Sequence, residues 1–290
     1  MKAATSHPVI NDISNKLDSL TPKAQALGTY IIQNPSKAVF MTTKELAEAC
    51  DISEATVVRF VSTLGYKKYS DFQDALKDFV NTGLTLPDRA AIKGIKEEGT
   101  DRLHREVLEE LNNLKHLYEH IDIDVMNQIV NHLNESHTVY VIGSRLSYTF
   151  AYYLGWSLTK IRRGVYTLKG SDTTTFDMLV NAPENSLVVL TACTRYPNEL
   201  IKLSKMIRRS GHTLITIVDS SISPVAQFAD LSLVVPGRSI PFIGNVSGML
   251  VTIQYIVQEL ANRKGDSLVI YQKHLEQMYL ENDILFNLDY

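Results

Sequence analysis

The spacing of apolar residues changes character near residue 137. Before that point, apolar positions recur at intervals of three and four, which is typical of amphipathic helices. From His137 onward, short apolar runs alternate with segments of helical spacing; the runs are HTVYVIG, VYTL, SLVVLT, TLITIV and LSLVV. Strands buried on both faces read as continuous apolar runs, so the pattern predicts a five-stranded parallel sheet with helices on both faces.

Helical spacing also predicts where the helices lie. In the second half of the chain, helices are expected at about 101–119, 123–134, 147–162, 172–181, 197–210, 223–229 and 246–262. The tail from Ser267 to Tyr290 reads as one more helix. The fold class is therefore α/β, with an all-helical N-terminal domain before a flavodoxin-like αβα domain.

Residues 1–80 carry start and stop signals for several short helices. Thr21 precedes Pro22, which is a favoured pair for a helix start, and Thr42 and Glu45 have the spacing of a capping box. Ser53 is placed to cap the next helix, and Gly65 follows its last apolar residue. The stretch Asn81–Thr100 has three glycines, a proline and mixed charge, which indicates a linker. The expected domains are 1–80, a linker and connecting helix at 81–122, a sheet domain at 123–265, and a tail at 266–290.

The helix at 53–64 has an apolar stripe and a polar outer face. A 3.6-residue period turns Val57, Val58, Val61 and Leu64 inward, with Phe60 at the edge of the stripe. Leu46 and Ala49 give the preceding helix an inner face, and the turn between the two helices is short. Two helices across a tight turn, the second with a polar outer face, form the helix-turn-helix layout, in which the second helix enters the major groove.

Charge supports a DNA partner only locally. The 290-residue chain has a net charge of −3, and residues 1–80 hold nine Lys or Arg and nine Asp or Glu. Between Ala55 and Ser70, however, Arg59, Lys67 and Lys68 are the only charged residues. Such cations suit phosphate contacts, and Arg59 suits either a phosphate or a guanine edge. A three-helix core with a solvated cationic edge is the alternative interpretation.

The stretch MTTKELAEACDISEATVVRFVSTLGYKKYSDFQDAL resembles the N-terminal domain of RpiR-type bacterial transcriptional regulators. The shared features are T-x-x-ELA, S-x-AT-V-x-RF and LG-x-x-x-Y-x-x-F, in that order. The resemblance implies that Ser53, Thr56, Arg59, Lys67 and Lys68 lie at or near the DNA surface, with packing as the alternative role of Thr56. Thr43, Glu54 and Tyr69 complete the predicted DNA-binding set, and Tyr69 is expected to supply either packing or a hydroxyl donor.

A second candidate site lies at the carboxyl ends of the strands. Ligands bind open α/β sheets where the strand order reverses, so neighbouring first and third strands would bring together Gly143–Ser147 and Thr191–Tyr196. Lys169–Asp172 lies on the same rim. Backbone N–H groups at the helix start, with the hydroxyls of Ser144 and Ser147, favour an anion; an ordinary strand–helix turn is the alternative. The first loop lacks the G-x-G-x-x-G spacing of dinucleotide sites.

Gly143-x-x-x-Ser147 and DSSISPVAQFADLSLVVP at 219–236 resemble the sugar-isomerase (SIS) domain of the same regulators. The resemblance implies oligomerisation and a phosphorylated sugar as effector. The predicted effector-binding residues lie in the loops that follow the first three strands, and they are Ser144, Arg145, Ser147, Ser171, Thr191, Cys193, Thr194, Arg195 and Tyr196. The usual second loop resembles S-x-S-G-x-T, whereas here Cys193 replaces a hydroxyl and Thr194 replaces the glycine. Arg145 and Arg195 are then the candidates to restore anion affinity, unless they are solvated rim residues.

The remaining features exclude several classes of site. Cys50 and Cys193 are the only cysteines, so neither a disulfide framework nor a cysteine-based zinc site is expected, and Cys193 reads as a small buried residue rather than a redox sensor. The eight histidines lack ligand spacing, so we expect no metal and no cofactor. No apolar run has the length of a membrane span, and we expect a cytoplasmic protein.

These observations together predict a regulator, not an enzyme. The expected protein binds an operator of double-stranded DNA as a homodimer or tetramer, represses a catabolic operon, and is controlled by a small anion, first of all a phosphorylated sugar. The alternatives are a regulator whose effector is a non-phosphorylated acid and a sugar-phosphate isomerase. For an isomerase, Asp172 and Glu199 are the candidate bases by loop position.

Overall fold

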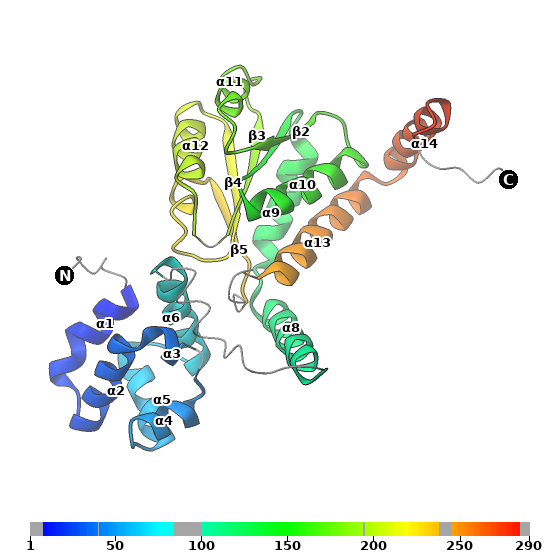
Figure 1. Cartoon of the computed structure of the whole chain (residues 1–290). Helices are drawn as coiled ribbons and strands as arrows, with labels where there is room; N and C mark the ends of the chain where they lie inside the picture. The colour runs from blue at the N-terminus through cyan, green and yellow to red at the C-terminus, as the bar shows by residue number, and fades with distance from the viewer. Residues whose placement is uncertain (1–7, 40, 84–99, 194, 238–244, 285–290) are drawn as a thin grey trace. The chain divides into compact units, whose positions relative to one another are not determined.

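A computed structural model describes residues 8–39, 41–83, 100–193, 195–237 and 245–284 (Figure 1). The chain divides into two compact units, a front unit that extends to Arg102 and a rear unit that begins at Leu103. Each is described by itself below.

The front unit is all-helical, as predicted. Its elements are α1 (Pro8–Lys16), a 3₁₀ turn (Leu17–Ser19), α2 (Pro22–Gln33), α3 (Pro35–Ala38), α4 (Thr43–Ala49), α5 (Glu54–Leu64) and α6 (Tyr69–Gly83). One apolar core joins α1, α2, α4, α5 and α6 through buried residues that include Ile13, Leu27, Leu46, Phe60 and Phe72.

Two inward assignments in this unit are wrong. Val58 is 50% exposed, whereas Phe60 is 2% exposed and packs edge-on against Phe72. On α4, Ala47 is buried and Ala49 is exposed. Both errors are rotations by a fraction of a turn, because helices only 7 and 11 residues long leave the direction of the apolar stripe poorly fixed.

The rear unit begins with two helices, α8 (Thr100–His120) and α9 (Ile123–Glu135). Five strands follow: β1 (Val139–Gly143), β2 (Val165–Lys169), β3 (Leu187–Ala192), β4 (Thr213–Val218) and β5 (Leu231–Val234). They form one parallel sheet in the order β2-β1-β3-β4-β5. The predicted sheet is confirmed, and β1 and β3 are neighbours, so the strand order reverses between them.

The connecting helices are α10 (Leu146–Thr159), α11 (Thr174–Val180), α12 (Asn198–Arg209) and α13 (Val246–Lys264). The helix expected at 223–229 is absent; only a 3₁₀ turn forms, at Ala226–Phe228. The segment between β4 and β5 is short, and Pro224 supplies no N–H to an α-helical turn. The chain therefore crosses this edge of the sheet as a tight loop.

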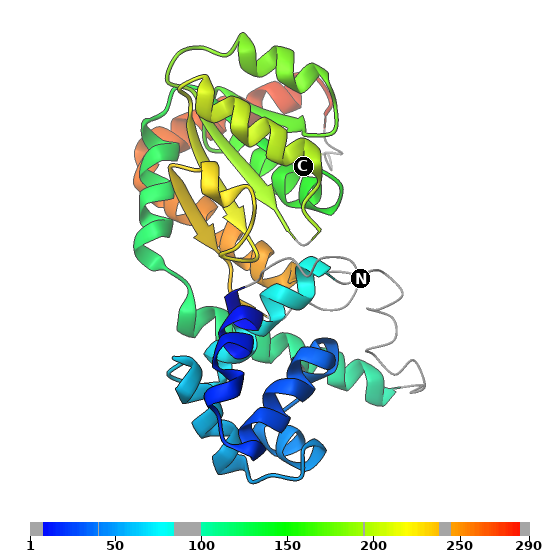
Figure 2. The same ribbon diagram turned by 90° about the vertical axis from the view of Figure 1, so that its left-hand side faces the viewer.

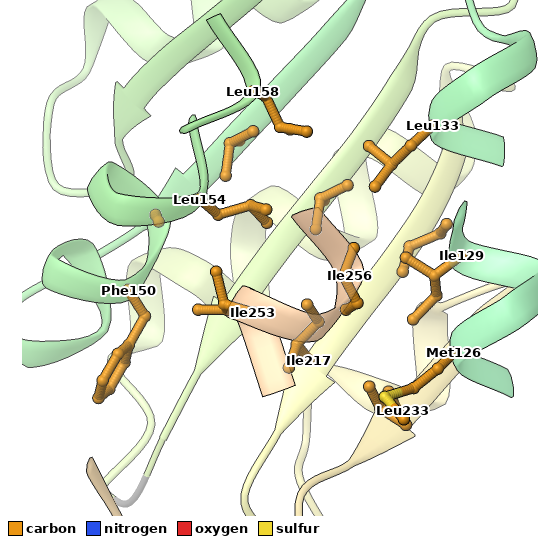
Figure 3. Close-up of a cluster of buried hydrophobic side chains, with 14 of the residues drawn as sticks. Met126, Ile129, Leu133, Phe150, Leu154, Leu158, Ile217, Leu233, Ile253 and Ile256 are labelled. Carbon is orange, nitrogen blue, oxygen red and sulfur yellow. The ribbon is translucent and has the colours of Figure 1, made fainter. Parts of the chain in front are cut away.

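Side chains alternate between the two faces of the sheet, and each face has its own core. Val139 and Val141 of β1 join a cluster with residues of α9, α10 and α13, including Ile129, Leu154 and Ile253 (Figure 3). Tyr140 and Ile142 join a second cluster with α11 and α12. Figure 2 shows helices on both sides of the strands in the rear unit.

The tail forms a further helix, α14 (Asp266–Glu281), after Gly265, and the rest of the tail from 285 to 290 lies outside the described residues. None of its described residues is fully buried. The helix is held to the end of α10 by polar contacts, because Tyr271 donates to the carbonyl of Thr159 and Lys160 bonds the hydroxyl of Tyr279.

Candidate functional site

In the front unit, α4 and α5 are joined by the short turn Cys50–Ser53. Asp51 adopts a positive φ of 50°, and the N–H of Ile52 bonds back to the carbonyl of Ala47, which closes the end of α4. The Ser53 hydroxyl accepts from the N–H of Thr56 at 3.3 Å and so caps α5. At the other end, Gly65 has a φ of +103°, a conformation that suits glycine.

The outer face of α5 presents polar groups to solvent. Arg59 is exposed, as are Ser53, Glu54, Ser62 and Thr63, and the exposed Lys67 and Lys68 follow just after the helix. The Arg59 guanidinium reaches the Thr56 hydroxyl at 3.5 Å, and Thr43 of α4 donates to the Glu54 carboxylate at 2.8 Å. The predicted DNA residues from Thr43 to Lys68 therefore lie together along α4, α5 and the following turn.

Tyr69 differs from the other predicted DNA residues. Its side chain is half-buried, and its hydroxyl donates to the carbonyl of Met41 at 2.6 Å. Thr56 is also half-buried, which fits its alternative packing role. This bond joins the start of α6 to the segment before α4 and agrees with the packing alternative for Tyr69, whereas a contact of Tyr69 with DNA stays a prediction.

In the rear unit, the loops after β1 and β3 meet through buried hydroxyls. Ser147 is 2% exposed, and its hydroxyl accepts from the N–H of Cys193 at 3.0 Å. Thr191 is fully buried, and its hydroxyl donates to the carbonyl of Ser147 at 2.7 Å. Gly143 is needed here because a Cβ on it would lie 2.4 Å from the same carbonyl. These bonds tie the start of α10 to the end of β3.

The hydroxyls expected to bind an anion thus also make hydrogen bonds within the protein. The helix begins at Leu146, so Ser147 lies inside its first turn and Arg145 takes the cap position without a side-chain bond. Ser144 is 1% exposed and donates to the carboxylate of Glu199 at 2.8 Å. Sequence reasoning singled out these serines but did not pair them with α12.

Arginines and a lysine lie on the exposed rim of the same edge. Arg145 and Arg195 are exposed and both have positive φ values, 54° and 64°. Such backbone conformations cost energy in residues other than glycine, and they recur at functional sites. Lys169 and Ser171 are also exposed, and the lysine lies over the Tyr148 ring at 5.3 Å. Thr194 lies outside the described residues.

The other predicted members of this site have structural roles. Tyr196 donates to the carboxylate of Asp219 at 2.7 Å, a pairing that sequence spacing could not foresee. Burial raises the pKa of the Cys193 thiol well above its usual value, with a further contribution from the charge of Asp219. A buried thiol with a raised pKa is a poor nucleophile, which agrees with its interpretation as a small buried residue.

The two candidate bases are placed differently. Asp172 accepts bonds from the backbone N–H and the hydroxyl of Thr174, both at 2.9 Å, and these lower the pKa of its carboxyl. A carboxylate that is held ionised in this way is a weak base. Glu199 is half-buried and bonded to Ser144.

The described residues contain no group of three or more His, Cys, Asp or Glu side chains arranged to hold a metal ion. No helix in the described part of the chain has the length and apolar character needed to cross a membrane.

Comparison with known proteins matches both units. Residues 8–82 match the family described as "Helix-turn-helix domain, rpiR family", and residues 132–261 match the SIS domain family. The chain belongs to the RpiR family of transcriptional regulators, with a helix-turn-helix domain followed by a SIS domain. Both resemblances stated from the sequence are confirmed.

Named relatives of this RpiR-family chain are also regulators. It is 24% identical over 281 residues to an HTH-type transcriptional regulator of Caldanaerobacter subterraneus, covering 93% of this chain and 95% of the relative. It is 22% identical over 230 residues to the regulator HexR of Pseudomonas aeruginosa, covering 79% of each chain. Among solved structures, NanR of Vibrio vulnificus aligns with 96% of this chain and 100% of its own, at 20% identity and a TM-score of 0.54. These matches support the fold and the helix-turn-helix assignment.

Proposed function

We propose that this RpiR-family regulator reads its DNA site with the outer face of α5, and that a phosphosugar bound at the carboxyl edge of the rear sheet controls the affinity for that DNA. The observation that carries the first half is the exposed position of Arg59 on α5, six residues after the Ser53 cap of a helix that follows a tight turn. In this motif the second helix lies in the major groove, with its N-terminal residues against the base edges.

A binding measurement tests the DNA half. Fluorescence anisotropy with the DNA upstream of the protein's own gene should give salt-sensitive binding to a specific site, because each phosphate contact releases counterions. Lys67→Ala and Lys68→Ala should weaken binding to all sequences and each reduce the salt slope by about one. Binding that is independent of salt and sequence would contradict the proposal.

Three observations support an effector at the sheet edge. NanR of Vibrio vulnificus, which shares this fold, was solved in complex with ManNAc-6P. The edge lies where the strand order reverses, which is the usual ligand position in open α/β sheets. Arg145, Lys169 and Arg195 supply cations on its exposed rim.

A thermal-shift screen of sugar phosphates, sugar acids and amino acids should find its largest shifts among the sugar phosphates. Unchanged affinity in Arg195→Ala would remove that residue from the site.

A dimer fits this function, since operators with two half-sites require two reading helices. An apolar groove with a volume of about 490 Å³ lies between α10 and α13, lined by Tyr152, Trp156, Leu250 and Val251 among others. Trp156 is 50% exposed there, and we propose a second copy of this chain as its cover. Trp156→Glu should then shift sedimentation toward the monomer, whereas an unchanged oligomer would exclude this face.

We propose regulation rather than isomerisation for the rear unit. The named relatives reported above are regulators, and Asp172 is held as a weak base by its bonds to Thr174. We propose that the protein represses a catabolic operon and that binding of the ligand relieves this repression. We also propose that it acts in the cytoplasm, where the operator lies. Deleting the gene should raise the transcript of the controlled operon, and turnover of a sugar phosphate by the purified protein would overturn the regulatory assignment.

A further inference from the structure

The carboxylate of Glu199 lies at the edge of the sheet where we propose that the effector's phosphate binds. Its Oε1 atom accepts the hydroxyl of Ser144 at 2.8 Å, which brings a side chain of α12 to the end of β1, 55 residues earlier in the chain. Among the described residues, no Lys, Arg or His lies within ion-pair distance of Glu199. Glu199 is half-buried, so part of the residue remains accessible to solvent.

A second negative charge lies at the same edge. Asp219 follows β4, and its carboxylate accepts from Tyr196 at 2.7 Å. Val218, the last residue of β4, pairs with Ala192 at the end of β3, so Asp219 lies beside the loop that follows β3. The inner part of the edge therefore carries two carboxylates, while the cations Arg145, Lys169 and Arg195 lie on the exposed rim.

An acidic residue in the first turn of a helix has an ordinary explanation, since it complements the helix dipole. Glu199, however, makes no capping bond to α12; the cap residue is Pro197, and no side chain caps the helix. The carboxylate instead reaches across to the buried Ser144. A helix-stabilising role therefore does not explain the direction of this side chain.

We infer that Glu199 is a specificity-determining residue that selects an effector with a protonated amine in addition to its phosphate, that is, an amino sugar phosphate. This inference rests on the proposed phosphosugar function of the same site. The rim cations bind the phosphate, and the inner carboxylate binds the ammonium group. A phosphate ligand without the amine meets the charge of Glu199 as a repulsion, and a ligand whose amine is acetylated cannot form the ion pair.

Calorimetric titration of the full chain tests the inference with three probes: glucosamine 6-phosphate, glucose 6-phosphate and N-acetylglucosamine 6-phosphate. At about pH 6.5 an amine with a pKa near 8 is protonated. The wild-type protein should bind glucosamine 6-phosphate about five- to tenfold more tightly than the other two, which is the effect of one partly solvated ion pair.

The variant Glu199→Gln keeps an acceptor for Ser144 and removes the charge. It should weaken binding of glucosamine 6-phosphate and strengthen binding of glucose 6-phosphate, so that the preference disappears. The matched control is Glu184→Gln, which should keep the wild-type preference. Glu184 is an exposed glutamate just before β3, so it lies at the amino ends of the strands, away from the proposed site. A fold-related defect would weaken all three ligands together instead of changing their order.

The outcomes separate the two proposals. Equal binding of the three probes to the wild-type protein, or a preference that survives in Glu199→Gln, overturns the inference and leaves the phosphosugar function intact. If none of the three probes binds while a non-phosphorylated acid does, the phosphosugar function fails and the inference fails with it.

Discussion

The start of each helix in the α4–α5 pair and the carboxyl edge of the rear sheet satisfy their polar groups over very different distances along the chain. In the front unit, Thr42 and Glu45 form a capping box, and the Ser53 hydroxyl accepts from Thr56, so each partner is three residues away. In the rear unit, Ser147 bonds Cys193 and Ser144 bonds Glu199, which are 46 and 55 residues apart. Local partners leave the outer face of α5 exposed, whereas the hydroxyls of the sheet edge are buried with their distant partners. Exposed polar side chains are thus the better candidates for ligand contacts, whereas buried polar side chains hold the loops of the fold together.

The largest loss of stability is expected from a substitution of Arg162, whose side chain donates hydrogen bonds to backbone carbonyls at the end of a helix that is distant in the sequence. It is 9% exposed and donates to the carbonyls of Leu133, Ser136 and His137, at and just after the end of α9. Arg162→Met keeps much of the side-chain volume but leaves these carbonyls without a donor, at a cost of about 3 kcal/mol in the free energy of unfolding. Calorimetry should show a lower melting temperature for the rear unit, with Arg163→Met as the exposed control. Equal melting of the two variants would mean that water replaces the guanidinium.

A somewhat smaller loss is expected at the sheet edge. Ser147→Ala removes the acceptor of the buried Cys193 N–H, which should cost the rear unit about 2 kcal/mol in the free energy of unfolding. Thr149→Ala, on the exposed side of the same helix, should be nearly neutral. Denaturant titration measures both. A neutral Ser147→Ala would show that the hydroxyl is available to a ligand rather than required by the fold.

For Arg59 in the front unit, we expect a loss of DNA affinity without a loss of stability. Arg59→Ala should lower the affinity for the specific DNA site about tenfold, or about 1.4 kcal/mol, and leave the free energy of unfolding nearly unchanged. Titrations against the site and against altered sites decide between a base contact, which is lost for one sequence only, and a phosphate contact, which is lost for all. A stable variant with full DNA affinity would remove Arg59 from the interface.

The smallest effects concern two exposed carboxylates, one in each unit, that behave alike. Hydrogen bonds from Thr42 lower the pKa of Glu45, and hydrogen bonds from Thr174 lower the pKa of Asp172. A lowered folded-state pKa stabilises the protein above the unfolded-state pKa, and this contribution is lost as the pH falls through the folded-state pKa. Titration followed by NMR should therefore find that the pKa of each carboxyl lies below its ordinary value. Ordinary pKa values would mean that the hydrogen bonds to Glu45 and Asp172 are broken in solution.

The same contrast explains how much the sequence could predict. The five strands, the capping box at Thr42 and the cap at Ser53 were predicted because their signals lie within a few residues. The bonds from Ser144 to Glu199 and from Tyr196 to Asp219 were not, because spacing along the chain does not show which loops meet across a sheet. The inward assignment of Val58 failed for a third reason, since tertiary packing selected the direction of a short helix.

The claim that joins the two units is that occupation of the sheet edge changes the affinity of α5 for DNA. It is tested by measuring the dissociation constant of the full chain for a DNA site selected from a random pool, with and without saturating glucosamine 6-phosphate. The account predicts a change of about fivefold or more, which corresponds to about 1 kcal/mol of coupling, and its loss in a variant that no longer binds the sugar phosphate. An unchanged dissociation constant in protein shown to be saturated with ligand would contradict it.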